Sequence, residues 1–392
     1  MNSFIGSDTV KQCIKSYLNT INNDLYNISK YIYDNPESSF NEHKACNYLT
    51  NILKKNNFTI KDNFIDISTS FYAEYGYGFP KICFICEYDA FEGRGHLTGH
   101  NLISSMSIGA ALSLSKAISK LEKGSIIVLG CPGEFKGSSK VTMVKQGVFE
   151  NIDAVLMAHP HTITMESGTS MATIPLKISY NSKADIAYKR LQDFSAQDAC
   201  LLTLNILNLL DKKIGTEMYI NSSLISHVDS PLYVPSNTDI EMYIRGSKME
   251  SLIPLENKIR GICKFVSDFM DVDSENFIFE MPYDELLTND ALSRVFSHNL
   301  KESGIIDISP ANKNFSSLSI GSVSKVCPCI HPYISITQDA SINYLSNEFA
   351  KSTISNFAHN VVLKTSQALA LTGLDLIEKG NLINEVNTLF HN

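Results

Sequence analysis

The stretch Pro-Lys-Ile-Cys-Phe-Ile-Cys-Glu-Tyr at residues 80–88 is a nearly continuous apolar run, and it indicates the fold class of this chain. Such a run is typical of a β-strand buried on both faces, as in a parallel sheet. Similar runs occupy residues 124–131 and 154–158, and the segments between them, at about 102–120 and 138–147, have helical apolar spacing. Strands that alternate with helices in this way predict an α/β fold with a mostly parallel sheet.

A change of pattern near residue 170 indicates a second domain. Residues 172–180 alternate like a half-exposed strand, and a helix is expected at about 195–211. We therefore expect an inserted domain at residues 172–285, within a core domain formed by residues 1–171 and 286–392. Its order of strand-helix-strand-strand-helix-strand is ferredoxin-like. The remaining elements of that order are strands near 222–228, 238–245 and 276–281, and a helix at about 248–270.

The composition sets limits on partners and location. The chain has 392 residues, which suits roughly two domains of about 100–200 residues each, and 44% hydrophobic with 19% charged residues is typical of globular proteins. A net charge of −8 without a basic cluster argues against nucleic acid and anionic membranes as partners. We expect a cytoplasmic protein that does not span a membrane, because no secretory signal is evident and no apolar run reaches about 18 residues.

Three polar clusters follow the three buried strands. They lie at residues 87–101, 130–137 and 157–161, and they contain histidines and carboxylates. A single histidine is more often a core or surface residue than a functional one. Ligands of α/β sheets, however, gather at the carboxyl ends of the strands, so three clusters at successive strand ends predict one common site.

These three clusters, in this order and spacing, resemble the amidohydrolase branch (subfamily D) of the M20 peptidases, whose members act on N-acyl amino acids and small dipeptides. The family patterns are E-Y-D-A-L-P…G-H-A-C-G-H-N, P-A-E-E-G-G-G-K and M-x-H-P. Shorter segments near both ends of the chain also resemble the family, so the resemblance covers essentially the whole chain. It implies an M20-type two-domain architecture with an inserted lid, a homodimer formed through the lid, and a small amino-acid or peptide-like ligand.

The resemblance also implies which site residues are retained. Family members hold two divalent metals with a bridging cysteine, two histidines, a glutamate and a distal histidine, while a separate glutamate is the general base. His100 and His159 match the two histidines. Glu134 matches the general base, and Asp89 matches the aspartate that supports the metal site. Both retained histidines belong to the same metal position.

Three of the five ligand positions differ from the family. The bridging cysteine falls on Thr98, the metal-binding glutamate on Phe135 and the distal histidine near Leu345. A neutral hydroxyl cannot offset the repulsion between two dications, and a phenyl ring cannot ligate a metal. Catalytic zinc normally keeps three protein ligands. We therefore expect either no metal or a single divalent ion, Zn or Mn, that is weakly held by His100 and His159.

In the inserted domain, one functional residue of the family is lost and another is retained. The family's lid histidine, which reaches across the dimer to the reacting carbonyl, falls near Asp185-Ile186, and neither residue can replace it. Arg245 is retained at the end of a strand. It is expected to bind substrate, although pairing with a carboxylate of the same domain is an alternative.

The losses favour a pseudoenzyme or small-ligand binder that no longer performs two-metal hydrolysis of amide bonds. One alternative is an active mononuclear amidohydrolase that uses His100, His159 and Glu134. Such a site could be supplemented by Asp89, His161 or Asp339.

A further alternative is metal-independent acyl transfer or amide formation in the same cleft. Cys131 lies near Glu134 in the sequence and is the nucleophile that this chemistry would use. Cys131 also ends an apolar strand, however, which favours a buried and inert thiol.

Overall fold

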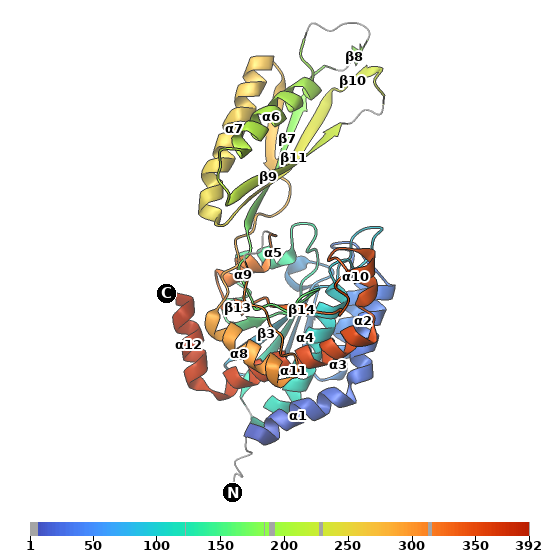
Figure 1. The fold of residues 1–392 in the computed structure, drawn as a ribbon, viewed down its shortest axis with the longest axis vertical. Coiled ribbons are helices and arrows are strands. Elements are labelled where there is room, and N and C mark those ends of the chain that lie inside the picture. The colour runs from blue at the N-terminus through green and yellow to red at the C-terminus, as the bar shows by residue number, and fades with distance from the viewer. Residues whose placement is uncertain are drawn as a thin grey trace. The chain divides into compact units, whose positions relative to one another are not determined.

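The chain forms two compact units. The computed structural model describes residues 7–121, 123–183, 185–187, 193–226, 230–312 and 316–391. One unit contains Met1–Thr169, Leu287–Lys313 and Ser322–Asn392, and the other contains Ser170–Leu286 and Asn314–Gly321 (Figure 1). Each unit has its own cluster of buried apolar side chains. The predicted α/β class is confirmed.

The first unit is built on a six-stranded sheet of order β1-β2-β4-β3-β5-β13. Its centre is parallel: β3 pairs with β4 and with β5, and β5 pairs with β13. These strands are the buried runs of the sequence, and every residue of β4 is buried. Their bounds are Lys81–Cys86 for β3, Gly124–Gly130 for β4, Ala154–Leu156 for β5 and Cys329–Ile330 for β13.

One edge of this sheet is antiparallel, which the sequence pattern did not predict. β2 (Phe71–Tyr77) pairs with β4, and β1 (Thr59–Asp62) pairs with β2. No side chain of β1 is buried, and β2 is exposed at its carboxyl end. Neither strand therefore shows the continuous apolar run that marks the central strands. Between them, Phe64–Asp66 forms a short 3₁₀ helix.

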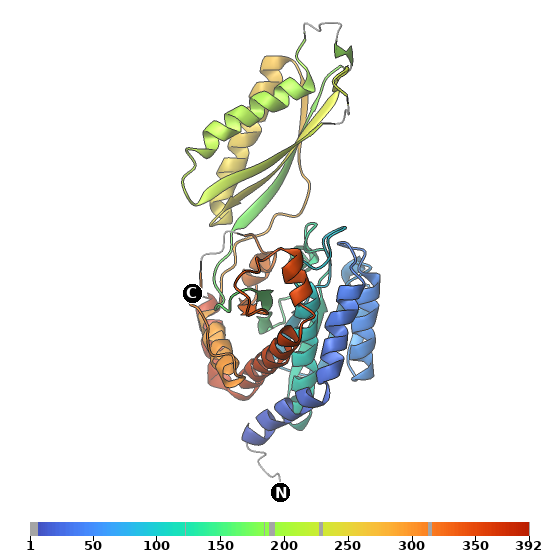
Figure 2. The same ribbon diagram turned by 45° about the vertical axis from the view of Figure 1, so that its right-hand side comes forward.

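Helix α4 (His100–Leu121) is the central helix of the first unit. It packs against α1 (Ser7–Thr20), α2 (Asn22–Asp34) and α11 (Asn356–Glu378) (Figure 2). Among the described helices, only α4 is long and apolar enough to cross a membrane, but 89% of its apolar window is buried inside the protein. Because its apolar surface is covered by the unit itself, α4 is a core helix.

The apolar residues of 9–33 keep helical spacing, but the structure divides this segment into α1 and α2 at Ile21, whose backbone (φ −99°, ψ 10°) is not helical. The side chain of Ile21 nevertheless stays buried, so the apolar spacing continues across the break. The other helices of this unit are α3 (His43–Lys55), α5 (Ser139–Lys145), α8 (Asp290–Glu302), α10 (Asn347–Ser352) and α12 (Gly380–His391), while α9 (Ile320–Ser324) spans the boundary between the two units. A small parallel pair is formed by β6 (His159–His161) and β14 (Tyr333–Ser335).

The second unit has the predicted ferredoxin-like order. Its four strands form an antiparallel sheet of order β12-β7-β11-β9, and α6 and α7 cover one face of it (Figures 1 and 2). The bounds are β7 Ala172–Asn181, α6 Ala196–Asp211, β9 Met218–Ser226, β11 Asn237–Gly246, α7 Met249–Met270 and β12 Asp273–Ile278. A short pair, β8 (Asp185–Ile186) with β10 (Tyr233–Val234), extends from this sheet.

Candidate metal site

The carboxyl ends of the central strands place three possible metal ligands together. Glu87 follows β3, His100 begins α4, and His159 begins β6 just after β5. One ligand atom of each residue lies within 4.8 Å of those of the other two, and all three side chains are buried. The structure thus brings the two predicted histidines together and adds Glu87, which we had not predicted as a ligand.

Asp89 orients the His100 ring. The Nδ1 atom of His100 lies 2.8 Å from Asp89 Oδ1 and 3.0 Å from the Asp89 carbonyl oxygen, which indicates that Nδ1–H is the donor. His100 Nε2 then faces Glu87 Oε2 at 3.4 Å. Burial opposes the imidazolium, but the hydrogen bond to Asp89 and the surrounding carboxylates outweigh burial and raise the pKa of His100.

Asp89 is itself held by several hydrogen bonds. Ser39 Oγ donates to its Oδ2 at 2.7 Å, and the backbone N–H of Phe135 donates to the same oxygen at 3.1 Å. Burial alone would raise the pKa of Asp89, but the hydrogen bond and charge of His100, together with these donors, lower it. Asp89 is therefore an ionised carboxylate directed at His100, as expected of a residue that supports a metal ligand.

His159 presents its Nε2 atom to the cluster. Its Nδ1 lies 2.8 Å from the carbonyl oxygen of Pro160, so Nδ1–H is the donor and Nε2 is the unprotonated nitrogen. Burial, followed by the charges of nearby histidines, lowers the pKa of His159 well below its ordinary value. A neutral imidazole with an open Nε2 is the form that binds metals.

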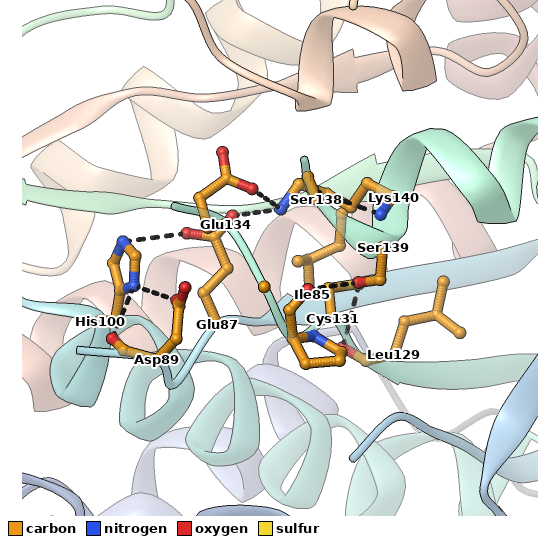
Figure 3. A network of polar contacts seen from close by, with 12 residues as sticks. Ile85, Glu87, Asp89, His100, Leu129, Cys131, Glu134, Ser138, Ser139 and Lys140 are labelled. Atoms are coloured by element: carbon orange, nitrogen blue, oxygen red, sulfur yellow. Dashed lines mark hydrogen bonds and ion pairs between the residues drawn. The ribbon is translucent and has the colours of Figure 1, made fainter. Parts of the chain in front are cut away.

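A buried lysine lies beside these ligands. The Nζ atom of Lys140, in α5, lies 2.5 Å from Glu87 Oε1 and 2.7 Å from Glu134 Oε2 (Figure 3). The Lys140 side chain is completely buried. Burial lowers its pKa, but the two carboxylates more than compensate and raise it, so the ammonium stays charged. Burial also raises the pKa of Glu87, and the charge of Lys140 opposes that shift.

The three positions that depart from the family pattern supply no second set of ligands. The Phe135 ring stacks on His100, with centroids 4.8 Å apart and an interplanar angle of 8°, and also on Phe91 at 4.0 Å. Leu345 is 45% exposed with φ +68°. Thr98 is buried, and its hydroxyl has no hydrogen-bond partner among the described residues. This donor set does not fit a two-metal centre.

An aromatic and histidine cluster packs against His159. The ring centroids of His331, Tyr333 and Tyr344 lie 5.2, 5.7 and 6.2 Å from that of His159. His331 is buried, its Nδ1 has no partner among the described residues, and burial lowers its pKa to about 4. Tyr344 directly precedes Leu345, the position at which the family has its distal histidine. In this chain the ring of Tyr344 packs against His159, and no histidine is present at that position.

The remaining predicted residues of the first unit are not among the three clustered ligands. Cys131 is completely buried, and burial raises the pKa of its thiol to about 12, which disfavours a nucleophilic thiolate. Asp339 is at the surface and accepts hydrogen bonds from the backbone and hydroxyl of Ser341. His161 accepts a hydrogen bond from the backbone of Ile163 through Nδ1, at 3.3 Å.

Arg245 belongs to the second unit. It lies on β11, and its guanidinium carbon is 5.2 Å from the centroid of the Tyr243 ring. A cation–π contact of this kind leaves the guanidinium able to bind an anion, because it uses the face of the group and none of its N–H donors. No carboxylate of the described residues forms a salt bridge with Arg245.

Two residues of the site were not predicted from the sequence. Glu87 stands at the end of the buried strand run and matches the first residue of the family pattern E-Y-D-A, and these two signals could have identified it. The family pattern for the segment around Lys140 also ends in a lysine, but nothing local signals its complete burial, because lysines are almost never completely buried unless paired.

Comparison with known proteins finds relatives along most of the chain, although no family model matches it. Mouse Xaa-Arg dipeptidase is 29% identical over 385 residues, covering 93% of this chain and 88% of the relative. One subunit of the p-aminobenzoyl-glutamate hydrolase of Escherichia coli K12 is 28% identical over 260 residues, covering 60% of this chain and 54% of the relative. Among solved structures, a dinuclear metal-binding M20 peptidase from Bacillus subtilis has a TM-score of 0.63 at 14% identity, covering 91% of this chain and 99% of that one.

Proposed function

Since this chain is a member of the M20 amidohydrolase and peptidase family, we propose that its site holds one divalent metal ion instead of two. The proposed ligands are Glu87, His100 and His159. We propose further that the two-metal hydrolysis of amide bonds is lost, and that the protein binds an amino-acid or peptide-like small molecule at this site.

The single observation that carries this proposal is the geometry of the three donors. Zinc binds nitrogen and carboxylate oxygen at about 2.0–2.2 Å, so two ligand atoms of a tetrahedral ion lie about 3.4 Å apart. His100 Nε2 and Glu87 Oε2 are separated by 3.4 Å. With His159 as the third donor, the set has the number and type of ligands that mononuclear zinc sites use.

The charges around the site also favour one dication. Glu87, Asp89 and Glu134 contribute three negative charges when ionised, and Lys140 contributes one positive charge. With both histidines neutral, the net charge is −2, which one divalent ion neutralises. Buried charges are stable only when compensated in this way.

The chain's own residues have defined parts in this proposal. Asp89 fixes the His100 ring so that Nε2 faces the ion, and Lys140 holds the Glu134 carboxylate at the edge of the site. A bound divalent ion supplies Lewis-acid chemistry and would polarise a carbonyl oxygen of the ligand. Arg245, in the second unit, has guanidinium donors that can form a bidentate pair with a carboxylate, and we retain it as a proposed substrate-binding residue.

An active one-metal amidohydrolase is the second candidate. One observation favours it. The Lys140 ammonium contacts both the proposed ligand Glu87 and Glu134, the residue that matches the general base, and so holds Glu134 next to the proposed ligand. Metal-independent chemistry at Cys131 is disfavoured by the burial of that thiol.

The names of the relatives, a dipeptidase and a p-aminobenzoyl-glutamate hydrolase, support amide-containing molecules as the ligand class. A cytoplasmic homodimer formed through the second unit remains part of the proposal.

Metal stoichiometry tests the proposal. Purified protein is stripped with chelator, equilibrated with Zn or Mn, and measured by elemental analysis and calorimetric titration. We expect one ion per wild-type chain, loss of binding in His159→Ala, and no change in Asp339→Asn, which alters an exposed carboxylate outside the site. Two ions per wild-type chain, or equal binding by His159→Ala, would contradict the one-metal site.

Hydrolysis assays on the same samples separate the two candidates. Metal-loaded protein is incubated with a panel of N-acyl amino acids and dipeptides, and ligand binding is followed in parallel. The binding role predicts saturable binding without turnover. Turnover that disappears in Glu134→Gln would support the one-metal enzyme instead.

A further inference from the structure

We infer that the first unit has a second ligand site, which binds a dipeptide with a free ammonium and a free carboxylate. The site is a cavity of about 910 Å³ between α11 and the segments that follow β6, α8 and β14. Pockets for small ligands measure about 300–1,000 Å³, so the cavity has room for a dipeptide. Its lining does not include Glu87, His100 or His159, and the inference is therefore independent of the proposed metal site.

Helix α11 forms one wall of the cavity and supplies a cation. Phe357, Val361 and Lys364 line the cavity at helical spacing, so they share one face of α11. The Nζ atom of Lys364, which is partly buried, donates to the carbonyl oxygen of Gly304 at 3.1 Å. An ammonium has three N–H donors, and Lys364 has no other partner among the described residues. Two of its donors are therefore available to an anionic group of a ligand.

Residues 305–308 form another wall and supply an anion. This Ile-Ile-Asp-Ile segment belongs to no helix or strand, and the backbone N–H groups of residues 306–308 have no acceptor in the described part of the chain. Asp307 is exposed, and its carboxylate has no hydrogen-bond or salt-bridge partner in the same part of the chain. The segment therefore offers N–H donors for a peptide carbonyl and a carboxylate for an ammonium.

The charges of the lining match the two ends of a free peptide. Lys364 and Asp307 are its two charged residues, and they have opposite signs. A peptide carboxylate can pair with Lys364 while the peptide ammonium pairs with Asp307. Ile163 and Ile306, which are 51% and 70% exposed, also belong to the lining and favour apolar side chains on the peptide.

The spacing of the two charges indicates the length of the peptide. Gly304, which holds the Lys364 ammonium, is three residues from Asp307, so their Cα atoms are at most about 10 Å apart. An extended dipeptide spans roughly 7 Å, and an ion pair of about 2.8 Å at each end extends this to about 12 Å. A dipeptide can therefore reach both charges even at the largest separation, whereas a single amino acid falls short of it.

Calorimetric titration with alanyl-leucine tests the second ligand site. The titrated protein is the full chain with His159→Ala, kept free of metal, so that the proposed metal site is disabled. We expect saturable binding of one dipeptide per chain. Adding Lys364→Met should weaken binding about tenfold or more, because it removes the partner of the peptide carboxylate. Adding Lys351→Met, which alters an exposed lysine outside the cavity, should change affinity less than about threefold.

Two modified peptides locate the two ends of the ligand. Alanyl-leucine amide lacks the carboxylate and N-acetyl-alanyl-leucine lacks the ammonium, and each should bind about tenfold more weakly than the free dipeptide. Asp307→Asn should weaken binding of the free dipeptide but not of the N-acetyl peptide, because the group that Asp307 pairs with is already absent from the latter. By the same reasoning, Lys364→Met should not weaken binding of the amide.

Two results would overturn the inference. One is the absence of saturable binding, and the other is equal affinity of the Lys364→Met and Lys351→Met proteins for alanyl-leucine. If circular dichroism shows that Lys364→Met does not fold, Asp307→Asn decides, since it alters an exposed side chain. An equal effect of Asp307→Asn on the free and the N-acetyl peptide would then reject the site. None of these results depends on Zn binding, so the one-metal proposal and this inference can fail separately.

Discussion

At the scale of single residues, Asp89 contacts both a proposed metal ligand, His100, and the loop that carries Glu134. Its carboxylate accepts from His100 and Ser39 and from the backbone N–H of Phe135. It therefore orients a proposed metal ligand and also fixes the backbone of the loop that carries Glu134. A residue in such a position acts on metal binding through the ligand that it orients.

The effect of Asp89 can be measured with Asp89→Asn, which keeps the size of the side chain and removes its charge. We expect Zn affinity to fall about 10–100-fold, the range typical when the partner of a ligating histidine is lost. Ser39→Ala is the matched control, since it removes one hydrogen bond to the same carboxylate and leaves the charge, and it should change affinity less than about threefold. Equal Zn affinity in Asp89→Asn and wild type would show that Asp89 does not support a metal ligand.

The limits of prediction are also visible at this scale. His100, His159, Glu134 and Asp89 could be identified because each occupies a position in a motif. The burial of Lys140 could not be predicted, because it depends on the convergence of two strand ends that are far apart in sequence. Local sequence gives residue type and spacing, whereas burial is a property of the assembled core.

At the scale of elements, the segment that leads into α3 holds the loop between β4 and α5. Glu42 is buried, and its two carboxylate oxygens accept from the backbone N–H of Gly133 and from the hydroxyl of Thr69, each at 2.9 Å. The Phe40 ring lies against Gly133, and a Cβ atom there would come within 2.3 Å of it. The loop that carries Glu134 is thus anchored by an element about 90 residues away in sequence.

The pH dependence of stability should report on this anchor. Burial, followed by the charge of Asp89, raises the pKa of Glu42 to about 7. A carboxyl whose pKa is higher in the folded state than the ordinary 4.5 stabilises the fold at low pH, and this stabilisation is lost as pH rises from about 4.5 to about 7. At about 1.4 kcal/mol per pKa unit, the loss could reach roughly 3 kcal/mol.

Glu42→Gln keeps the acceptor for Gly133 and removes the ionisation. Relative to wild type, we therefore expect it to gain unfolding free energy between pH 5 and pH 8, measured by chemical denaturation at each pH. Parallel curves for the two proteins over this range would contradict the raised pKa of Glu42.

Elements with a strong periodic pattern were predicted well and the others poorly. β3, β4 and α4 follow apolar runs or helical spacing, and the structure has them within a few residues of the prediction. β1 and β2 were missed because neither has a continuous apolar run: no side chain of β1, the edge strand, is buried, and β2 is exposed at its carboxyl end. The break at Ile21 leaves no mark in the sequence pattern, because the apolar spacing is kept across it.

At the scale of the whole molecule, the inserted unit has the features of an independently folding domain. Its core is formed by its own strands and helices, and Leu176, Ile240 and Ile259 are completely buried within it. The two ends of the insertion lie side by side, because Thr173 and Tyr283 exchange backbone hydrogen bonds at 2.9 and 3.2 Å. An insertion whose ends meet can be removed without straining either part.

The fragment of residues 170–286 should therefore fold alone. We expect a cooperative thermal transition by circular dichroism, because its sheet and both covering helices are complete within the fragment. Leu176→Ala should destabilise it by about 2–5 kcal/mol, the cost of a cavity at a buried leucine, while Leu209→Ala, at an exposed position of α6, should cost less than about 0.5 kcal/mol. If the fragment shows no cooperative transition, or if the two variants unfold alike, the core of this unit is not sufficient for folding.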